Sequence, residues 1–227
     1  MRKWVMSLVL IATLSSQSAA ATAAVAPSAE VTVAASTRQA TVGDQVQVTV
    51  KVRNATHLSG IYAKLKYDPS RMELARTTSG SRMISFGPSF GSYGGQDVDE
   101  TAGSIAYPMV YSKPLDVGGG ELLALTVTFK AVKAGPVSFQ LEETQVTNYV
   151  SKVLLEFDSN GPTATLAVAP VMEKVPGETK ISLQTVLRYM KQSSGAVPDA
   201  NGDGLQDKED VKFVLSLIEP MSLGAAP

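Results

Sequence analysis

The sequence predicts a mainly β protein, a sandwich or barrel of short strands, followed by a small α-helical calcium-binding module. Apolar and polar residues alternate with a period of two through residues 30–168, which is typical of half-buried strands. This region contains no helical stripe of ten or more residues, and alternation with one polar face favours antiparallel sheets packed face to face. Residues 199–210 have the spacing of a calcium-binding loop and run directly into a 3-4-7 apolar stripe.

About nine strands are expected before residue 169. The clearest alternation lies in residues 46–52, 61–67, 123–130, 137–141 and 163–168. Weaker strands are expected at residues 30–34, 72–76, 84–86 and 104–111. Turn residues separate many of these segments, as a sandwich or barrel requires.

Residues 84–103 are glycine-rich and carry Phe86, Phe90 and Tyr93 without a clear period. Two interpretations stay open. The segment is either a surface loop whose aromatic rings tuck against the sandwich, or a flap that borders a recognition face.

The first residues are typical of a secretory signal peptide. A charged start, Met1-Arg2-Lys3, precedes an apolar stretch and a run of small residues that offers cleavage after Ala21 or Ala23. We therefore assign residues 1–23 to a signal peptide and expect a secreted or extracellular protein, in which cell-surface attachment would be indirect. The apolar stretch is too short for a membrane span.

The bulk composition excludes some partner classes. The net charge is −1, no basic run is present, and the sequence has no cysteine. Nucleic acid and anionic membranes are therefore poor candidates as partners. Because the chain can form no disulfide, its stability must come from packing or from a bound metal.

The loop of residues 199–210 places oxygen ligands where an EF-hand-type loop needs them. Six residues would hold Ca²⁺: Asp199, Asn201, Asp203 and Asp210 by side chain, Leu205 by its backbone carbonyl, and Asp207 through water. Gly204 stands at the sharp turn. The alternative is a solvated turn that happens to be rich in acidic residues.

An internal duplication organises the C-terminal region. The apolar positions 183, 186, 187 and 190 recur 28 residues later at 211, 214, 215 and 218, and two such short helices are expected to bury their stripes on each other. In the first copy, Val171, Glu173, Val175 and Ser182 replace the ligand positions, so it should not bind calcium. The expected organisation is a sandwich over residues 30–169, a linker over 170–177 and the helical module over 178–220.

Three segments carry a family likeness. Val42-Gly-Asp44 before the valine-rich strand, Gly60-Ile-Tyr-Ala-Lys-Leu-Lys-Tyr-Asp-Pro-Ser-Arg-Met-Glu-Leu74, and Leu122-Leu-Ala-Leu-Thr-Val-Thr-Phe-Lys130 resemble the cohesin modules of cellulosomal scaffoldins. The resemblance implies a nine-stranded jelly-roll sandwich that binds a dockerin through one sheet face, without catalysis.

The unit that follows is similar to a dockerin, the calcium-dependent ligand of cohesins, and the resemblance implies a second module that docks into another cohesin. Asp210 at loop position twelve is dockerin-like. In dockerins, positions ten and eleven help to choose the partner; here they are Lys208 and Glu209 instead of a small hydroxyl pair, which leaves the partner class open. The lost first loop is a second departure, and it weighs against symmetry-related docking.

The family likeness places the recognition surface on the face of the third, fifth, sixth and eighth strands. Outward residues there would include Tyr62, Lys64 and Lys66, although a merely solvated lysine face explains the same pattern.

An enzyme is not expected. The single histidine, His57, lies in a short polar segment between strands, and the carboxylate pairs are adjacent in sequence or lie in a polar loop. The main alternative is a carbohydrate-binding sandwich with a calcium-stabilised tail. Because Trp4 would leave with the signal peptide, its sugar-stacking rings would have to come from Phe86, Phe90, Tyr93, Tyr107 and Tyr111.

We therefore expect a secreted, non-enzymatic scaffold protein for calcium-dependent assembly, in polysaccharide-degrading or cell-surface complexes. The expected partners are a dockerin on the sandwich and a cohesin on the tail. The tail could also dock on its own sandwich, as a closed monomer or in a head-to-tail chain.

Overall fold

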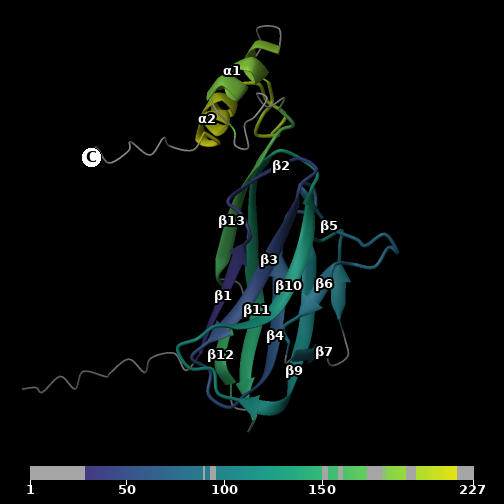
Figure 1. The fold of residues 1–227 in the computed structure, drawn as a ribbon, viewed down its shortest axis with the longest axis vertical. Coiled ribbons are helices and arrows are strands. Elements are labelled where there is room, and N and C mark those ends of the chain that lie inside the picture. The colour runs from purple at the N-terminus through teal and green to yellow at the C-terminus, as the bar shows by residue number, and fades with distance from the viewer. Residues whose placement is uncertain are drawn as a thin grey trace, which may run out of the picture.

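The alternating segments form two sheets that pack face to face (Figure 1). The structure, a computed structural model, describes residues 29–88, 90–92, 96–149, 153–157, 161–172, 181, 183–192 and 198–218. The predicted signal peptide and Tyr93 lie outside these residues, as does most of the predicted linker.

The first sheet, sheet A, is antiparallel and is centred on two long strands. Its members are β1 (Glu30–Ala35), β3 (Gln45–Arg53), β10 (Leu122–Ala131), β5 (Met72–Leu74) and β6 (Ile84–Phe86). The valines at even positions of β3 are 0–1% exposed, as the period-two pattern predicts.

The second sheet, sheet B, is built around β4 (Leu58–Lys66), which lies between β11 (Gly135–Asn148) and β9 (Ser104–Leu115). The remaining members are β13 (Thr163–Ala169), β2 (Gln39–Thr41), β12 (Val153–Phe157), β7 (Phe90–Ser92) and β8 (Asp97–Asp99). All pairs are antiparallel except β13 with β2.

Aromatic rings fill the space between the two sheets. The ring of Phe129 on β10 lies 4.8 Å from that of Tyr67 and 5.0 Å from that of Phe139 on β11. Phe129 and Phe139 are fully buried. The two sheets are therefore joined by one continuous apolar core.

The nine expected strands are present, and the described residues contain four more, namely β2, β7, β8 and β12. Two of these, β7 and β8, lie in residues 84–103, which we predicted to be irregular. Both pair with the long strand β9. Their strand conformation is set by that neighbour and not by local alternation, because each is only three residues long.

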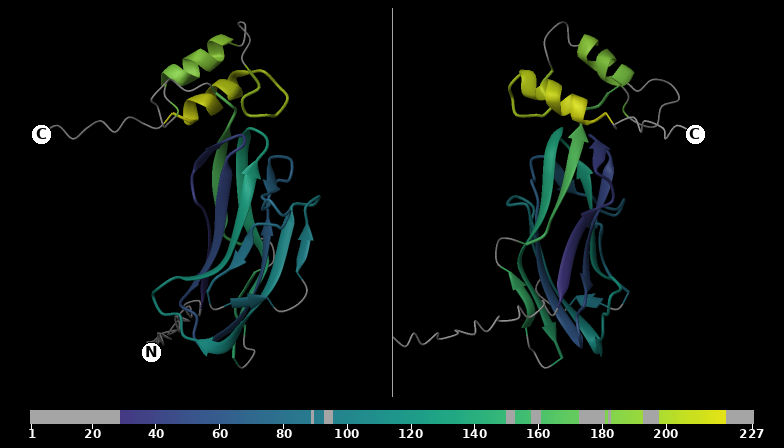
Figure 2. Two further views of the ribbon diagram at one scale, coloured as in Figure 1. Left: turned by 45° about the vertical axis from the view of Figure 1, so that its right-hand side comes forward. Right: turned by 90° about the vertical axis from the view of Figure 1, so that its left-hand side faces the viewer.

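Two helices, α1 (Leu183–Gln192) and α2 (Lys208–Ser216), lie at one end of the sandwich, beyond the ends of β13 and β2 (Figures 1 and 2). Val186, Val214 and Leu217 from this unit share a small buried cluster with Ala169, the last residue of β13, and with Met172, three residues further on.

The prediction that the helices bury their apolar stripes on each other is wrong in part. Val186 and Val214 are buried, but Leu183, Leu187 and Leu215 are 48–57% exposed. The buried residues of the pair pack on Ala169 and Met172 as well as on each other, so part of each stripe is left outside.

Candidate recognition face and cation loop

The outward side of β4 carries the three predicted face residues. Tyr62, Lys64 and Lys66 alternate with side chains that are buried in the core. Tyr62 is 36% exposed. Because β4 is central in sheet B, these residues lie in the middle of an outward face that β11 and β9 extend on either side.

Lys64 is fixed on this face by a bulge in β11. Its Nζ lies 2.6 Å from Oε1 of Glu143, and this hydrogen bond, more than the opposing effect of burial, raises the pKa of Lys64. Glu143 has φ +43°, and the register of β11 shifts between Glu142 and Gln145. Thr144 within the bulge is fully buried. The bulge thereby turns Glu143 toward the neighbouring strand.

Lys66 is also held in place, since its Nζ donates to the carbonyl of Ala102 at 3.0 Å. Both outward lysines of β4 therefore have a hydrogen-bond partner on this side of the sheet.

The aromatic residues of the proposed flap point inward where the structure describes them. Phe90 is 8% exposed and meets Tyr111 edge-on at 4.3 Å. Phe86 is half-buried and meets Tyr107 at 5.3 Å. Phe90 therefore belongs to the core and does not offer its ring to a partner, as the first interpretation of residues 84–103 expects. Tyr107 and Tyr111 are also buried, so these rings form no exposed platform for a sugar.

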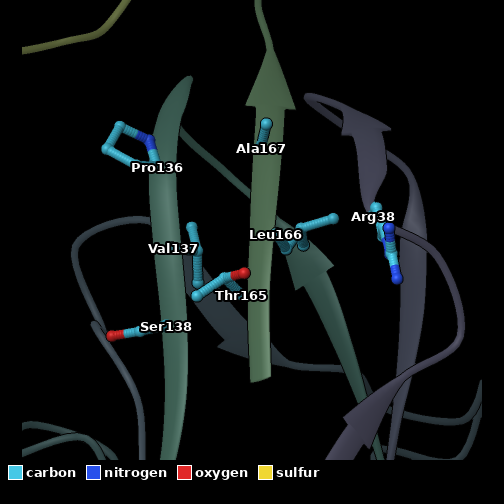
Figure 3. A pocket seen from close by; sticks show the side chains of 7 residues that line it. All are labelled: Arg38, Pro136, Val137, Ser138, Thr165, Leu166 and Ala167. Atoms are coloured by element: carbon cyan, nitrogen blue, oxygen red, sulfur yellow. The ribbon is translucent and has the colours of Figure 1, made fainter. Parts of the chain in front are cut away.

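A shallow pocket of about 520 Å³ lies over β11 and β13 (Figure 3). Its lining residues are Arg38, Pro136, Val137, Ser138, Thr165, Leu166 and Ala167. A second pocket, of about 430 Å³, lies beside Arg82 and Tyr107. Neither pocket is lined by a carboxylate. His57 is 69% exposed beside Asp116, as expected of a loop histidine.

The loop of residues 199–210 is organised by its own side chains. The Gly204 N–H donates to Oδ2 of Asp199 at 3.0 Å, and the Asp203 N–H donates to Oδ1 of Asn201 at 2.9 Å. The Leu205 N–H donates to Oδ1 of Asp203 at 2.7 Å. Gly204 has φ +90°, a conformation that glycine adopts without strain. The sharp turn therefore occurs at the predicted position.

Asp210 closes the loop from the first turn of α2. Its Oδ1 accepts the N–H groups of Ala200 and Asn201 at 2.7 and 3.1 Å, and its Oδ2 accepts that of Asp207 at 2.9 Å. Asp207 is the N-cap of α2, so the two residues form a capping box. Burial acts to raise the pKa of Asp210, but the backbone N–H groups of Asp207, Asn201, Ala200 and Asp210 together outweigh it, and the pKa is lowered. Asp210 is therefore held as a carboxylate.

The donor set of the loop suits a hard cation, because every predicted ligand is an oxygen. One oxygen, Oδ1 of Asp199, is buried without a hydrogen-bond partner, which leaves it available to a ligand. Within the described residues, however, no three His, Cys, Asp or Glu side chains converge as a group that could hold a metal. The carboxylates instead accept backbone N–H groups. In type and in spacing along the loop the residues match a calcium ion, although they are not gathered around one point in this conformation.

The remaining predicted positions of the C-terminal unit are the two partner-choosing residues and the ligand positions of the first copy. Lys208 and Glu209 are exposed at the start of α2, where Glu209 pairs with Lys212 at 2.7 Å. Of the degenerate first copy, Val171 is 70% exposed, and residues 173, 175 and 182 lie outside the described residues.

One functional contact was missed from the sequence. Arg71, which directly follows Asp68-Pro69-Ser70, reaches the loop of residues 199–210 and donates to the carbonyls of Asn201 and Gly202 at 3.0 and 3.4 Å. No periodicity or motif links residues 130 positions apart, so only an alignment of related chains could have signalled this pair.

The two packed sheets and their shared core define a class of protein, the β-sandwich. Residues 29–154, more than half of the chain, match the family model described as the cohesin domain. The chain belongs to the cohesin domain family.

Solved structures show the same fold. A type II cohesin A11 from Bacteroides cellulosolvens has a TM-score of 0.51 at 16% identity, over 61% of this chain and 99% of its own. The cohesin module of a Clostridium perfringens family 33 glycoside hydrolase has a TM-score of 0.51 at 9% identity, over 64% and 100%. A type II cohesin–X-dockerin complex from Acetivibrio cellulolyticus gives 0.50 at 17% identity, over 62% and 99%. A search of the curated proteins gives no match.

Cohesin domains are non-enzymatic modules for protein–protein interaction in cellulosome-like assemblies, which agrees with the expectation of a binding protein. Among the helices of the described residues, none has the length and apolar character that crossing a membrane requires.

Proposed function

We propose that this chain is a secreted, non-enzymatic assembly protein that binds a dockerin-type protein on its sandwich. The C-terminal unit would be a dockerin-like, calcium-dependent module. The observation that carries the proposal is the match of residues 29–154 to the cohesin domain, on a sandwich whose strand β4 presents Tyr62, Lys64 and Lys66 outward. The signal-like N-terminus supports an extracellular site of action.

On the sandwich, the partner would contact the outward face of sheet B around β4. Tyr62 offers an exposed ring, and rings of this kind are enriched at interfaces. Lys64 and Lys66 offer positive charge, with Lys64 pre-positioned by Glu143. A partner with acidic side chains in register with the two lysines would gain electrostatic complementarity.

In the C-terminal unit, six residues would hold the calcium ion: Asp199, Asn201, Asp203, the carbonyl of Leu205, Asp207 through water, and Asp210. When bound, the ion would neutralise carboxylates that otherwise repel each other, and its binding energy would stabilise the helix pair. Two features would favour binding of the ion: Asp210 is held ionised, and Oδ1 of Asp199 has no hydrogen-bond partner.

The face assignment is tested by charge reversal. Binding of the complete chain to a panel of purified dockerin modules is measured by isothermal titration calorimetry, for wild type and for Lys64→Glu with Lys66→Glu. We expect a loss of affinity of at least about tenfold, because like-charge juxtaposition costs several kcal/mol. The matched control reverses Lys51 and Lys130, which project from sheet A.

If the two double variants bound dockerin with equal affinity, the assignment of the recognition face to sheet B would be wrong. If instead the wild-type chain binds no dockerin but is retained on insoluble polysaccharide, the sandwich is a carbohydrate-binding module and the protein-partner proposal fails.

A further inference from the structure

Arg71 connects the two parts of the chain. Its guanidinium donates from Nη1 to the carbonyls of Ala134 and Asn201 and from Nη2 to the carbonyl of Gly202. Ala134 belongs to the turn between β10 and β11, whereas Asn201 and Gly202 belong to the loop of residues 199–210. The arginine side chain is only 15% exposed. One side chain therefore bridges the sandwich and the C-terminal loop in a largely buried position.

Two glycines allow this close approach. A Cβ on Gly135 would collide with the Arg71 guanidinium and with the carbonyl oxygen of Asn201. A Cβ on Gly202 would lie 2.6 Å from the carbonyl oxygen of Ala134 and 2.9 Å from Arg71 Nη1. The backbones of the loop and of the β10–β11 turn are thus nearly in contact, with no space left for a side chain between them.

The contact continues into a buried apolar cluster. Ala200, the second residue of the loop, is fully buried and belongs to the same cluster as Ala169 and Met172. The loop is consequently held against the sandwich by apolar packing at Ala200 and by the hydrogen bonds from Arg71 at Asn201 and Gly202.

We propose that Arg71 couples the cation loop to the sandwich, so that occupation of the loop and docking of the C-terminal unit on its own chain stabilise each other. This rests on the proposed function in that the ion is calcium. By fixing the carbonyls of residues 201 and 202, Arg71 holds the backbone that carries Asp199, Asn201 and Asp203. These contacts offset part of the conformational entropy that the loop loses when it orders around an ion. By linkage, the ion must strengthen docking by the same factor.

The charge of Arg71 is partly balanced on the sandwich side. Its Nε lies 3.3 Å from Oδ2 of Asp68, so the guanidinium is paired on the sandwich side. The two loop carbonyls that it binds are not among the predicted ligands. Arg71 therefore acts as a positioning residue that orders the loop from outside without competing for its oxygens.

The test uses the complete chain without its signal segment. Calcium affinity is measured by isothermal titration calorimetry for wild type, Arg71→Met and Arg71→Lys, and sandwich unfolding is followed by the near-ultraviolet circular dichroism of the buried tyrosines, with calcium and with chelator. The control is Arg82→Met, which also removes an arginine from an ion pair but one formed with Glu100, in the sandwich itself.

We expect Arg71→Met to weaken calcium binding about tenfold, within the usual range of coupling between sites. Arg71→Lys should behave similarly, since an ammonium cannot span two carbonyls as the planar guanidinium does. Calcium should raise the midpoint of sandwich unfolding by about 2–4 °C in wild type and in Arg82→Met. This shift should be lost in the Arg71 variants.

The outcomes separate the two proposals. If wild type binds no calcium, the calcium part of the proposed function fails and the coupling fails with it. If wild type and both Arg71 variants bind calcium equally well, the calcium module stands and the coupling alone is overturned. If Arg71→Met lost its near-ultraviolet spectrum, the sandwich of that variant would be unfolded. The calcium affinity of Arg71→Lys, which keeps the charge and the aliphatic stem, would then decide whether the coupling exists.

Discussion

The sandwich and the C-terminal unit are stabilised in different ways. The sandwich buries one continuous core between two sheets, in which long strands such as β3 and β10 pair over nearly their whole length. The described part of the C-terminal unit buries three of its own apolar residues, Val186, Val214 and Leu217, together with Ala200, and it completes the cluster with Ala169 and Met172 at the end of the sandwich.

This difference indicates that the sandwich can be stable by itself, whereas the C-terminal unit needs contacts from outside itself. A core that joins two sheets is self-sufficient, whereas helices of nine or ten residues are marginal in water without packing. The C-terminal unit obtains that packing from the end of β13 and from Arg71, and in our proposal from an ion. The sandwich should therefore tolerate loss of the unit better than the unit tolerates loss of the sandwich.

The largest effect should come from opening the sandwich core. Replacing Phe129 with alanine removes a fully buried ring that contacts Tyr67 and Phe139. We expect the free energy of unfolding of the sandwich to fall by about 3–5 kcal/mol. Denaturant unfolding followed by near-ultraviolet circular dichroism measures it.

The matching substitution in the other region is Leu217→Ala, which also removes a fully buried side chain. It should cost about 2–5 kcal/mol in the C-terminal unit and much less in the sandwich, which feels the loss only through the docking contact. If Leu217→Ala lowered the stability of the sandwich as much as Phe129→Ala does, the two regions would form one cooperative unit and the contrast between them would be lost.

The next largest effect concerns the ion. We expect residues 170–227 to be largely unfolded in chelator. In millimolar calcium they should become helical, which would be measured as a gain of far-ultraviolet ellipticity at 222 nm. An ion at about 100 times its dissociation constant contributes roughly 2.7 kcal/mol. Asp199→Ala with Asp203→Ala should abolish the transition. Glu209→Gln, a nearby substitution outside the ligand set, is the control, and a spectrum that does not respond to chelator contradicts the prediction.

Most of the sandwich could be predicted from the sequence because its strands are half-buried. The valines of β3 alternate with polar residues, and this pattern directly reports which side of the strand faces the core. The same reasoning fails for β7 and β8, because three-residue strands contain too little sequence for a period. Their conformation comes from hydrogen bonds to β9, which local sequence does not encode.

The C-terminal unit was predictable in its elements but not in its packing. The 28-residue offset predicted both helices, and the loop spacing predicted the sharp turn at Gly204. The capping box of Asp207 and Asp210 was not predicted. The exposure of Leu183 and Leu187 could not be foreseen, because an amphipathic stripe does not specify which surface covers it. The contact from Arg71 joins segments that are distant in sequence, so it depends on the tertiary arrangement.

The smallest effect should come from a surface ion pair that fastens the segment after β8. Glu100 accepts hydrogen bonds from Arg82 and Arg76 at 2.8 and 2.6 Å, and the bond from Arg82, more than the opposing effect of burial, lowers its pKa below 4.5. A depressed folded-state pKa means that this stabilisation is fully present above the unfolded pKa and is lost as the pH falls through the folded one. Partly exposed pairs of this kind contribute about 0.2–1 kcal/mol. We therefore expect wild type to exceed Glu100→Gln slightly in thermal stability near neutral pH and the difference to vanish on acidification below the folded pKa. A difference that stays constant with pH would show that the ionised carboxylate of Glu100 does not fasten this segment to the sandwich.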